Sequence, residues 1–140
     1  IPPPGAYQTL GIIYMNKGKE KKALEFWHKE LKLYPASGKV YLNLGIFYFK
    51  HKDFNRAGFF FQRAIKFIPG HYAGYYGMGQ ILARENKFKQ AIYMYKKAIS
   101  LNPADAASYY FLGAAYAKSG NSLAISAFKQ AIKLKPNFAR

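Results

Sequence analysis

Three histidines, His28, His51 and His71, are the side chains of this chain best suited to metal binding or general-base catalysis. A metal site needs several donor side chains at short spacing, and a general base needs a partner that orients it. None of the three lies beside another histidine or an acidic cluster in the sequence, and the chain has no cysteine. We therefore interpret them as surface histidines, and we predict no catalytic residue, no metal site and no cofactor.

A glycine-rich stretch at 70–79 has the composition of a loop that cradles phosphate groups. Such a loop continues into Lys-Ser or Lys-Thr, or it follows a strand with a fixed order of glycines. Neither condition is met, so we interpret these glycines as structural. The six acidic residues are scattered and form no pair for acid–base catalysis. The sequence therefore predicts a protein that is not an enzyme.

A set of side chains that returns about every 34 residues defines the elements that must position any site. Each copy opens with a tyrosine, a leucine-like residue and a glycine: Tyr7, Leu10, Gly11; Tyr41, Leu44, Gly45; Tyr75, Met78, Gly79; and Tyr109, Leu112, Gly113. Each copy closes with an alanine, an aromatic residue and a proline: Ala23, Trp27, Pro35; Ala57, Phe61, Pro69; Ala91, Tyr95, Pro103; and Ala124, Phe128, Pro136. Spacings of three and four residues place each group on one helix face. Every copy therefore predicts two helices, the second of which ends before the proline.

Two copies depart from the repeating pattern, and each departure leads to a separate expectation. The last copy is one residue shorter, and we assign the loss to the turn at 119–122, where the two helices should be joined more tightly. In the first copy Glu30 stands where the other copies carry alanine. This glutamate is either a tolerated polar residue near the solvated end of the stack or a buried carboxylate paired with a neighbouring lysine.

This pattern resembles the tetratricopeptide repeat family along the entire chain. The resemblance implies an all-α fold, a right-handed α-solenoid of four helix-turn-helix repeats at approximately 4–37, 38–71, 72–105 and 106–138. Because each hairpin must stack on the next to bury its apolar face, we expect one domain over 1–140. The sequence starts at Ile1 and finishes with Pro136 to Arg140, which reads as the opening of a fifth repeat, so we interpret it as a fragment of a longer protein.

The resemblance also implies a concave groove, lined by the first helix of each repeat, that holds an extended or helical peptide. The partner-binding residues predicted on this stripe are Ile12, Lys39, Leu42, Asn43, Ile46, Phe49, Lys50, Tyr76, Gln80, Arg84, Tyr110, Phe111 and Lys118. The apolar members should anchor a partner, Asn43 and Gln80 should form hydrogen bonds, and the cations should steer acidic groups. The alternative is that these side chains pack on each other or on absent repeats.

The charge of the chain bears on what it binds. There are 22 lysine and arginine residues against six acidic ones, a formal net charge of +16, which favours a protein or peptide partner with acidic flanks. Three alternatives stay open: docking of the basic convex face to anionic membrane or nucleic acid, service as the accessory domain of a larger membrane-associated enzyme, and self-association through uncapped ends. The sequence leaves the location open between cytoplasmic and membrane-associated.

Overall fold

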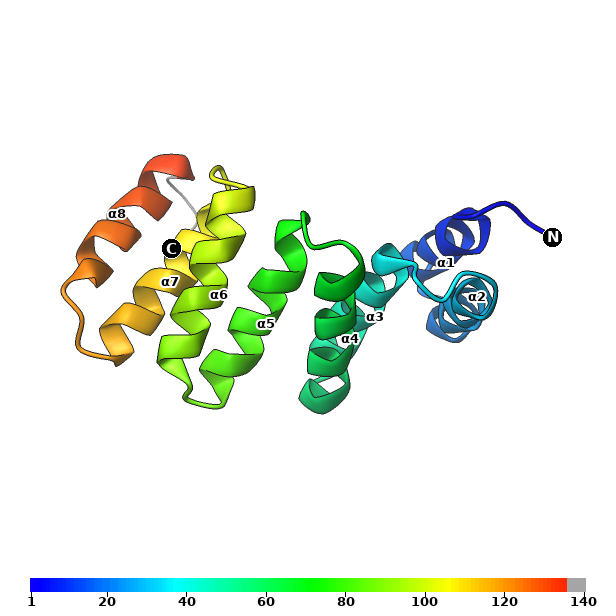
Figure 1. Cartoon of the computed structure of the whole chain (residues 1–140), viewed down its shortest axis with the longest axis horizontal. Helices are drawn as coiled ribbons and strands as arrows, with labels where there is room; N and C mark the ends of the chain where they lie inside the picture. The colour runs from blue at the N-terminus through cyan, green and yellow to red at the C-terminus, as the bar shows by residue number, and fades with distance from the viewer. Residues whose placement is uncertain (136–140) are drawn as a thin grey trace. The chain divides into compact units, whose positions relative to one another are not determined.

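The computed structural model describes residues 1–135, and in that range it contains eight α-helices and no strand. The helices are α1 (Ala6–Asn16), α2 (Glu20–Leu33), α3 (Gly38–Lys50), α4 (Phe54–Phe67), α5 (Tyr72–Arg84), α6 (Phe88–Leu101), α7 (Ala106–Lys118) and α8 (Leu123–Leu134) (Figure 1). Each predicted repeat forms one antiparallel helical pair. The second helices α2, α4 and α6 end two residues before Pro35, Pro69 and Pro103, as predicted. Pro136 lies outside the described residues.

Each hairpin closes where the glycine of its first helix meets the aromatic ring of its second helix. A Cβ atom placed on Gly11 would lie 2.2 Å from the indole nitrogen of Trp27, and one on Gly45 would lie 2.7 Å from the Phe61 ring. Gly79 and Tyr95 repeat this relationship, as do Gly113 and Phe128. The repeating glycine is therefore needed for the aromatic side chain to lie directly on the first helix.

The turn inside each hairpin passes through one residue with positive φ. These residues are spaced 34 apart: Gly18 (75°), Lys52 (60°), Asn86 (61°) and Gly120 (70°). In every copy the next amide donates a hydrogen bond back to the helix; the amide of Lys19, for example, lies 2.9 Å from the carbonyl oxygen of Tyr14. This left-handed turn satisfies carbonyl groups that the end of the helix would otherwise leave unpaired.

The last hairpin keeps the same turn although it is one residue shorter. The amide of Asn121 donates to the carbonyl oxygen of Tyr116 at 2.8 Å, as its counterparts do. Helix α8 has 12 residues, whereas α2, α4 and α6 each have 14. Four residues join α7 to α8, whereas three join the helices of every other hairpin, so α8 is two residues shorter and the expectation of a tighter joint was wrong.

Glu30 is buried, with 1% of its surface exposed, and its partners are backbone amides. Its two carboxylate oxygens accept hydrogen bonds from the amides of Gly5 (3.0 Å) and Gln8 (3.2 Å), at the start of α1. A carboxylate at this end of a helix also interacts favourably with the helix dipole. Both readings of Glu30 were therefore incomplete, because the residue is neither solvated nor paired with a lysine.

The contacts divide the chain into two compact units, Ile1–Ile68 and the part from Pro69 onward. The first unit holds α1 to α4, and its core is Trp27, Val40 and Leu44, against which Met15 and Phe47 also pack. The second holds α5 to α8, with α6 packed on both α5 and α7. That 1–140 forms one domain stays a prediction. Among the described helices, none has the length and apolarity that a bilayer crossing requires.

Candidate partner-binding site

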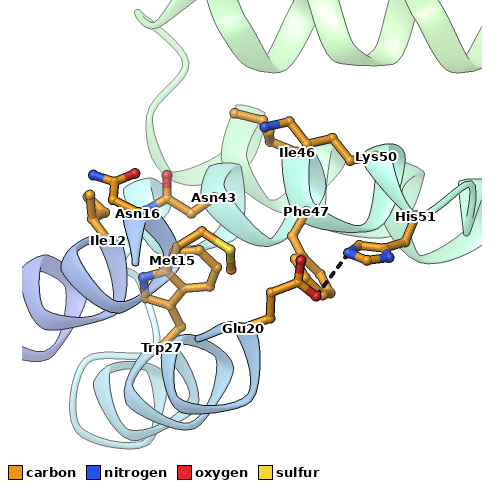
Figure 2. A pocket seen from close by; sticks show the side chains of 10 residues that line it. All are labelled: Ile12, Met15, Asn16, Glu20, Trp27, Asn43, Ile46, Phe47, Lys50 and His51. Carbon is orange, nitrogen blue, oxygen red and sulfur yellow. Dashed lines mark ion pairs between the residues drawn. The ribbon is translucent and has the colours of Figure 1, made fainter. Parts of the chain in front are cut away.

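The first unit contains a pocket of about 380 Å³ between α1, α2 and α3. Four of the predicted binding residues, Ile12, Asn43, Ile46 and Lys50, come together here. The remaining lining residues are Met15, Asn16, Glu20, Trp27, Phe47 and His51 (Figure 2). A volume of this size lies within the range of sites that bind small ligands or partner side chains.

The floor of this pocket is apolar and fixed in place. Trp27 is 3% exposed and belongs to the core, and its indole N–H donates to the carbonyl oxygen of Gln8 at 3.2 Å. Met15 packs against this core, and Figure 2 shows its side chain beside the Trp27 ring. Ile12 and Ile46 also line the pocket, and 36% and 40% of their surfaces are exposed. The pocket thus offers exposed apolar surface above a rigid aromatic ring.

Polar groups without partners lie in the same pocket. The side-chain nitrogen Nδ2 of Asn43 is buried and has no hydrogen-bond partner in the structure as described. A buried donor left unpaired costs about 1–3 kcal/mol. Figure 2 shows the Asn16 and Asn43 amide groups near each other, while Lys50, which forms no ion pair within residues 1–135, contributes a positive charge. The pocket therefore carries both polar and charged side chains beside its apolar surface.

One side of the pocket carries an ion pair that sequence reasoning missed. His51 Nε2 lies 3.2 Å from a carboxylate oxygen of Glu20, and the imidazole ring packs on Phe47 with ring centroids 4.4 Å apart (Figure 2). The pair joins the first residue of α2 to the residue that follows α3, so no spacing in the sequence signals it. Both side chains are half exposed, which makes the contribution of the pair to stability small.

The predicted residues of the second unit are largely engaged with one another. The Tyr76 ring packs on Tyr95 and Phe111, with centroid distances of 6.2 and 6.0 Å. The hydroxyl of Tyr95 donates to the side-chain oxygen of Gln80, which is thereby occupied. Burial, with a smaller contribution from the charge of Asp105, raises the pKa of Tyr76 to about 12.

The other predicted residues lie in different surroundings. Leu42 is buried at 8% exposure, Phe49 packs edge-on against Phe54, and Tyr110 packs against Phe128. Lys39 lines a separate pocket of about 590 Å³ near the start of α1 and the end of α2. Arg84 and Lys118 are exposed in the second unit. Their contact with a partner stays a prediction.

The two units differ at one equivalent place in the repeat. Trp27 in the first unit corresponds to Tyr95 in the second, and Asn43 corresponds to Phe111. The Phe111 ring stacks on Tyr95 with a centroid distance of 6.4 Å and an interplanar angle of 24°. The Asn43 amide makes no such ring contact, and Trp27 is covered in another way, since Met15 packs against its core and only 3% of Trp27 is exposed. The residue that corresponds to Phe111 thus lines the pocket of the first unit.

Solved structures with a similar fold cover almost the whole chain. The crystal structure of MamA is 29% identical, with a TM-score of 0.81 over 95% of this chain and 78% of that one. A MamA structure from Desulfovibrio magneticus RS-1, spanning residue 41 to the end, is 25% identical, with a TM-score of 0.81 over 93% of this chain and 74% of that one. No curated protein sequence matches the chain significantly.

Family models match the same repeats that the helices show. One, described as tetratricopeptide repeat, matches residues 4–36, 38–71 and 106–138, and another, described as TPR repeat, matches 79–120. The matched segments cover most of the chain, and the expected all-α repeat fold is confirmed. The chain belongs to the tetratricopeptide repeat family, whose domains generally serve as non-catalytic scaffolds for protein interaction.

Proposed function

We propose that this scaffold binds an extended or helical segment of a protein partner, and that the pocket between α1, α2 and α3 receives one anchoring side chain of that segment. The observation that carries the proposal is the pocket of about 380 Å³ in which Ile12 and Ile46 keep 36% and 40% of their surfaces exposed. These two side chains supply the apolar contact area for the anchor.

Electrostatics favour an acidic segment. The formal net charge of +16 attracts negatively charged partners over distances of about a Debye length and accelerates their association. Lys50 places one of these charges at the pocket itself. We therefore propose that acidic residues flank the anchor. Such contacts give specificity and association rate more than affinity.

Selection from a random peptide library displayed on phage tests the proposal. Trp27 is the only tryptophan in the chain and lies in the pocket, so its fluorescence reports occupancy of this site alone. Peptides that the wild-type chain enriches should change this fluorescence, and the Asn43→Ala/Lys50→Glu variant should bind them at least about tenfold more weakly, a loss of about 1.4 kcal/mol.

Lys96→Glu is the matched control, because Lys96 is an exposed lysine of the second unit that does not belong to the predicted stripe. It makes the same charge change away from the pocket and should leave the affinity within about twofold. The proposal fails if no peptide is enriched, or if enriched peptides bind the wild type and the double variant equally well.

Self-association is a second candidate, favoured by the outer face of α8. Ile125 and Ile132 are 63% and 49% exposed there. Their counterparts in α2, Leu24 and Leu31, pack against the core that α3 helps to form. A first helix from a second copy would cover α8 in the same way. The alternative contact near Phe138 lies outside the described residues.

Sedimentation velocity over a range of protein concentrations tests this candidate. Dimers or larger species should form in the wild type and should disappear in the Ile125→Lys/Ile132→Lys variant. A wild-type chain that stays monomeric at about 100 µM contradicts it, since a specific interface is expected to hold at micromolar concentration.

Docking of the basic face to an anionic membrane or to nucleic acid remains the third candidate. The second helices also carry exposed aromatic residues. These are Phe59 on α4, with the Arg63 guanidinium 5.1 Å from its ring centroid, and Tyr93 on α6. Binding of this kind should weaken steeply as salt rises, because phosphate contacts release counterions. It should also be unaffected by Asn43→Ala/Lys50→Glu, which separates it from binding in the pocket.

A further inference from the structure

We infer that the outer face of helix α4 docks on an anionic lipid membrane. Phe59 serves as the apolar anchor, and Arg56, Arg63 and Lys66 contact the lipid phosphates. These four residues form the α4 patch. The inference rests on the third candidate function, the docking of a basic face, and it specifies both the surface and the partner.

The residues of the α4 patch share one side of the helix, because they are spaced by three, four and three residues along α4. Phe59 is 51% exposed although its side chain is a large aromatic ring. Arg56 and Lys66 are exposed, and Arg63 is partly exposed. The helical rise separates Arg56 from Lys66 by about 15 Å along the axis, so one flat surface can contact the whole patch.

Each cation of the α4 patch lies over an aromatic ring of the same hairpin. The distances to the ring centroids are 5.4 Å for Arg56 over Tyr48, 5.1 Å for Arg63 over Phe59 and 5.3 Å for Lys66 over Phe67. A guanidinium placed over a ring keeps N–H donors at its edge, and these donors match the oxygen atoms of a phosphate. The rings also restrict the cationic side chains, which lowers the conformational entropy that binding would cost.

Acidic residues offset little of this charge. Asp53 is the only acidic residue of the hairpin formed by α3 and α4, and its carboxylate lies 3.6 Å from Nε of Arg56. No carboxylate of this hairpin accompanies Arg63 or Lys66. The α4 patch therefore has an excess of positive charge around its exposed ring.

The first hairpin provides a contrast within the same unit. The equivalent positions on α2 carry Lys22, Glu25, Lys29 and Lys32. A carboxylate thus takes the place of the Phe59 ring, and it lies 3.7 Å from Nζ of Lys29. Because an anionic surface repels a carboxylate and accepts a ring, the membrane contact belongs to α4 and not to α2.

A membrane complements both components of the α4 patch. Anionic headgroups attract each nearby lysine or arginine by about fivefold in affinity. The boundary between headgroups and acyl chains accepts an aromatic side chain from a helix that lies in the interface. Nucleic acid also offers phosphates, but proteins that bind single strands stack successive bases on several aromatic residues. The α4 patch presents Phe59 alone for such stacking.

Cosedimentation with lipid vesicles tests the inference. The wild-type chain should sediment with vesicles of phosphatidylcholine mixed with phosphatidylserine, and it should not sediment with vesicles of phosphatidylcholine alone. Phe59→Ser removes the anchor without changing the charge, and Arg63→Glu reverses one phosphate contact. Each variant should weaken binding at least about tenfold. Circular dichroism checks the helices of both, and Lys66→Glu takes the place of either variant that unfolds.

Lys29→Glu is the matched control, because Lys29 holds the position of Arg63 in the first hairpin and the charge change is the same. It should leave vesicle binding within about twofold. Equal losses with Lys29→Glu and Arg63→Glu would show a diffuse attraction and overturn the inference, as would full binding by Phe59→Ser.

An oligonucleotide in place of the vesicles separates the two sources of phosphate. Binding to the oligonucleotide without binding to vesicles overturns the inference and leaves the third candidate function standing. Binding to neither overturns both. The proposal of a peptide anchored between α1, α2 and α3 stands or falls separately, because no residue of the α4 patch lines that pocket.

Discussion

The carboxylate of Glu30, on α2, accepts hydrogen bonds from the backbone amide of Gly5, 3.0 Å away, and from that of Gln8. Gly5 itself has positive φ and provides no side chain to cap α1. The second helix of the hairpin thus supplies the cap that the first helix lacks. Tyr34 supports the same region from the end of α2, because its hydroxyl donates to the carbonyl oxygen of Pro2 at 2.7 Å.

Replacing Glu30 by alanine should therefore lower the free energy of unfolding of the first unit by about 1–3 kcal/mol, because two partly buried amides lose their acceptor. Urea unfolding followed by Trp27 fluorescence measures the change. Lys32→Ala, an exposed position on the same helix, is the control and should change stability by less than about 0.5 kcal/mol. A loss equally small for Glu30→Ala would mean that the cap contributes nothing.

Alanine at Gly45 should be strongly destabilising, by about 2 kcal/mol or more, because its Cβ would lie 2.7 Å from the Phe61 ring and force the helices apart. The matched control is Gly70→Ala. A Cβ atom there meets nothing within 4 Å, and the residue does not have positive φ. Thermal unfolding followed by circular dichroism compares the two, and equal Tm values would contradict the proposed closing contact.

Lys52 has the left-handed conformation that Gly18 and Gly120 have at the same place in their hairpins. A side chain with a Cβ pays a steric cost there that glycine avoids. Lys52→Gly should consequently raise stability by about 0.5–1 kcal/mol, with Lys50→Gly, inside the last turn of α3, lowering it by a similar amount. Chemical denaturation of the two variants provides the test; a destabilised Lys52→Gly would refute the steric explanation.

The raised pKa of Tyr76, about 12 in the folded chain against an ordinary value of 10, makes stability depend on pH. Burial favours the neutral phenol, so this contribution is complete below pH 10. It is lost as the pH rises from 10 through 12, because the unfolded chain releases the proton first. Tyr76→Phe should flatten the decline in Tm over that window.

Tyr93→Phe is the control for this titration, since Tyr93 is largely exposed and its removal should leave the alkaline decline of the wild type unchanged. If the two variants lose stability with identical pH profiles, burial of Tyr76 is not the cause.

The helices and hairpins could be predicted because their determinants are local. The glycine and the aromatic residue that meet within each hairpin lie about 16 residues apart in every copy, so the repeat itself encodes their contact. The exposure of Ile12 and Ile46 in one pocket with Asn43 and Lys50 also followed from the period, since all four lie on the predicted stripe.

The other features of the site depend on contacts between neighbouring helices, which the repeating sequence pattern does not predict. Gln80 lies on the same stripe as Ile12, yet its side-chain oxygen accepts the Tyr95 hydroxyl. Glu20 and His51 meet because the start of α2 lies near the end of α3, and both residues stand outside the repeating pattern. The position of a residue in the repeat therefore predicts the helix face on which it lies. The side chain that packs against it from a neighbouring helix determines whether its polar atoms remain unpaired.

The exchange of Asn43 for Phe111 shows how an array of similar hairpins can diversify. Neither residue belongs to the glycine, alanine and aromatic framework, so mutation at this place is not constrained by helix pairing. Over evolutionary time, a duplicated hairpin could change the shape of its surface through one codon while its backbone stays the same.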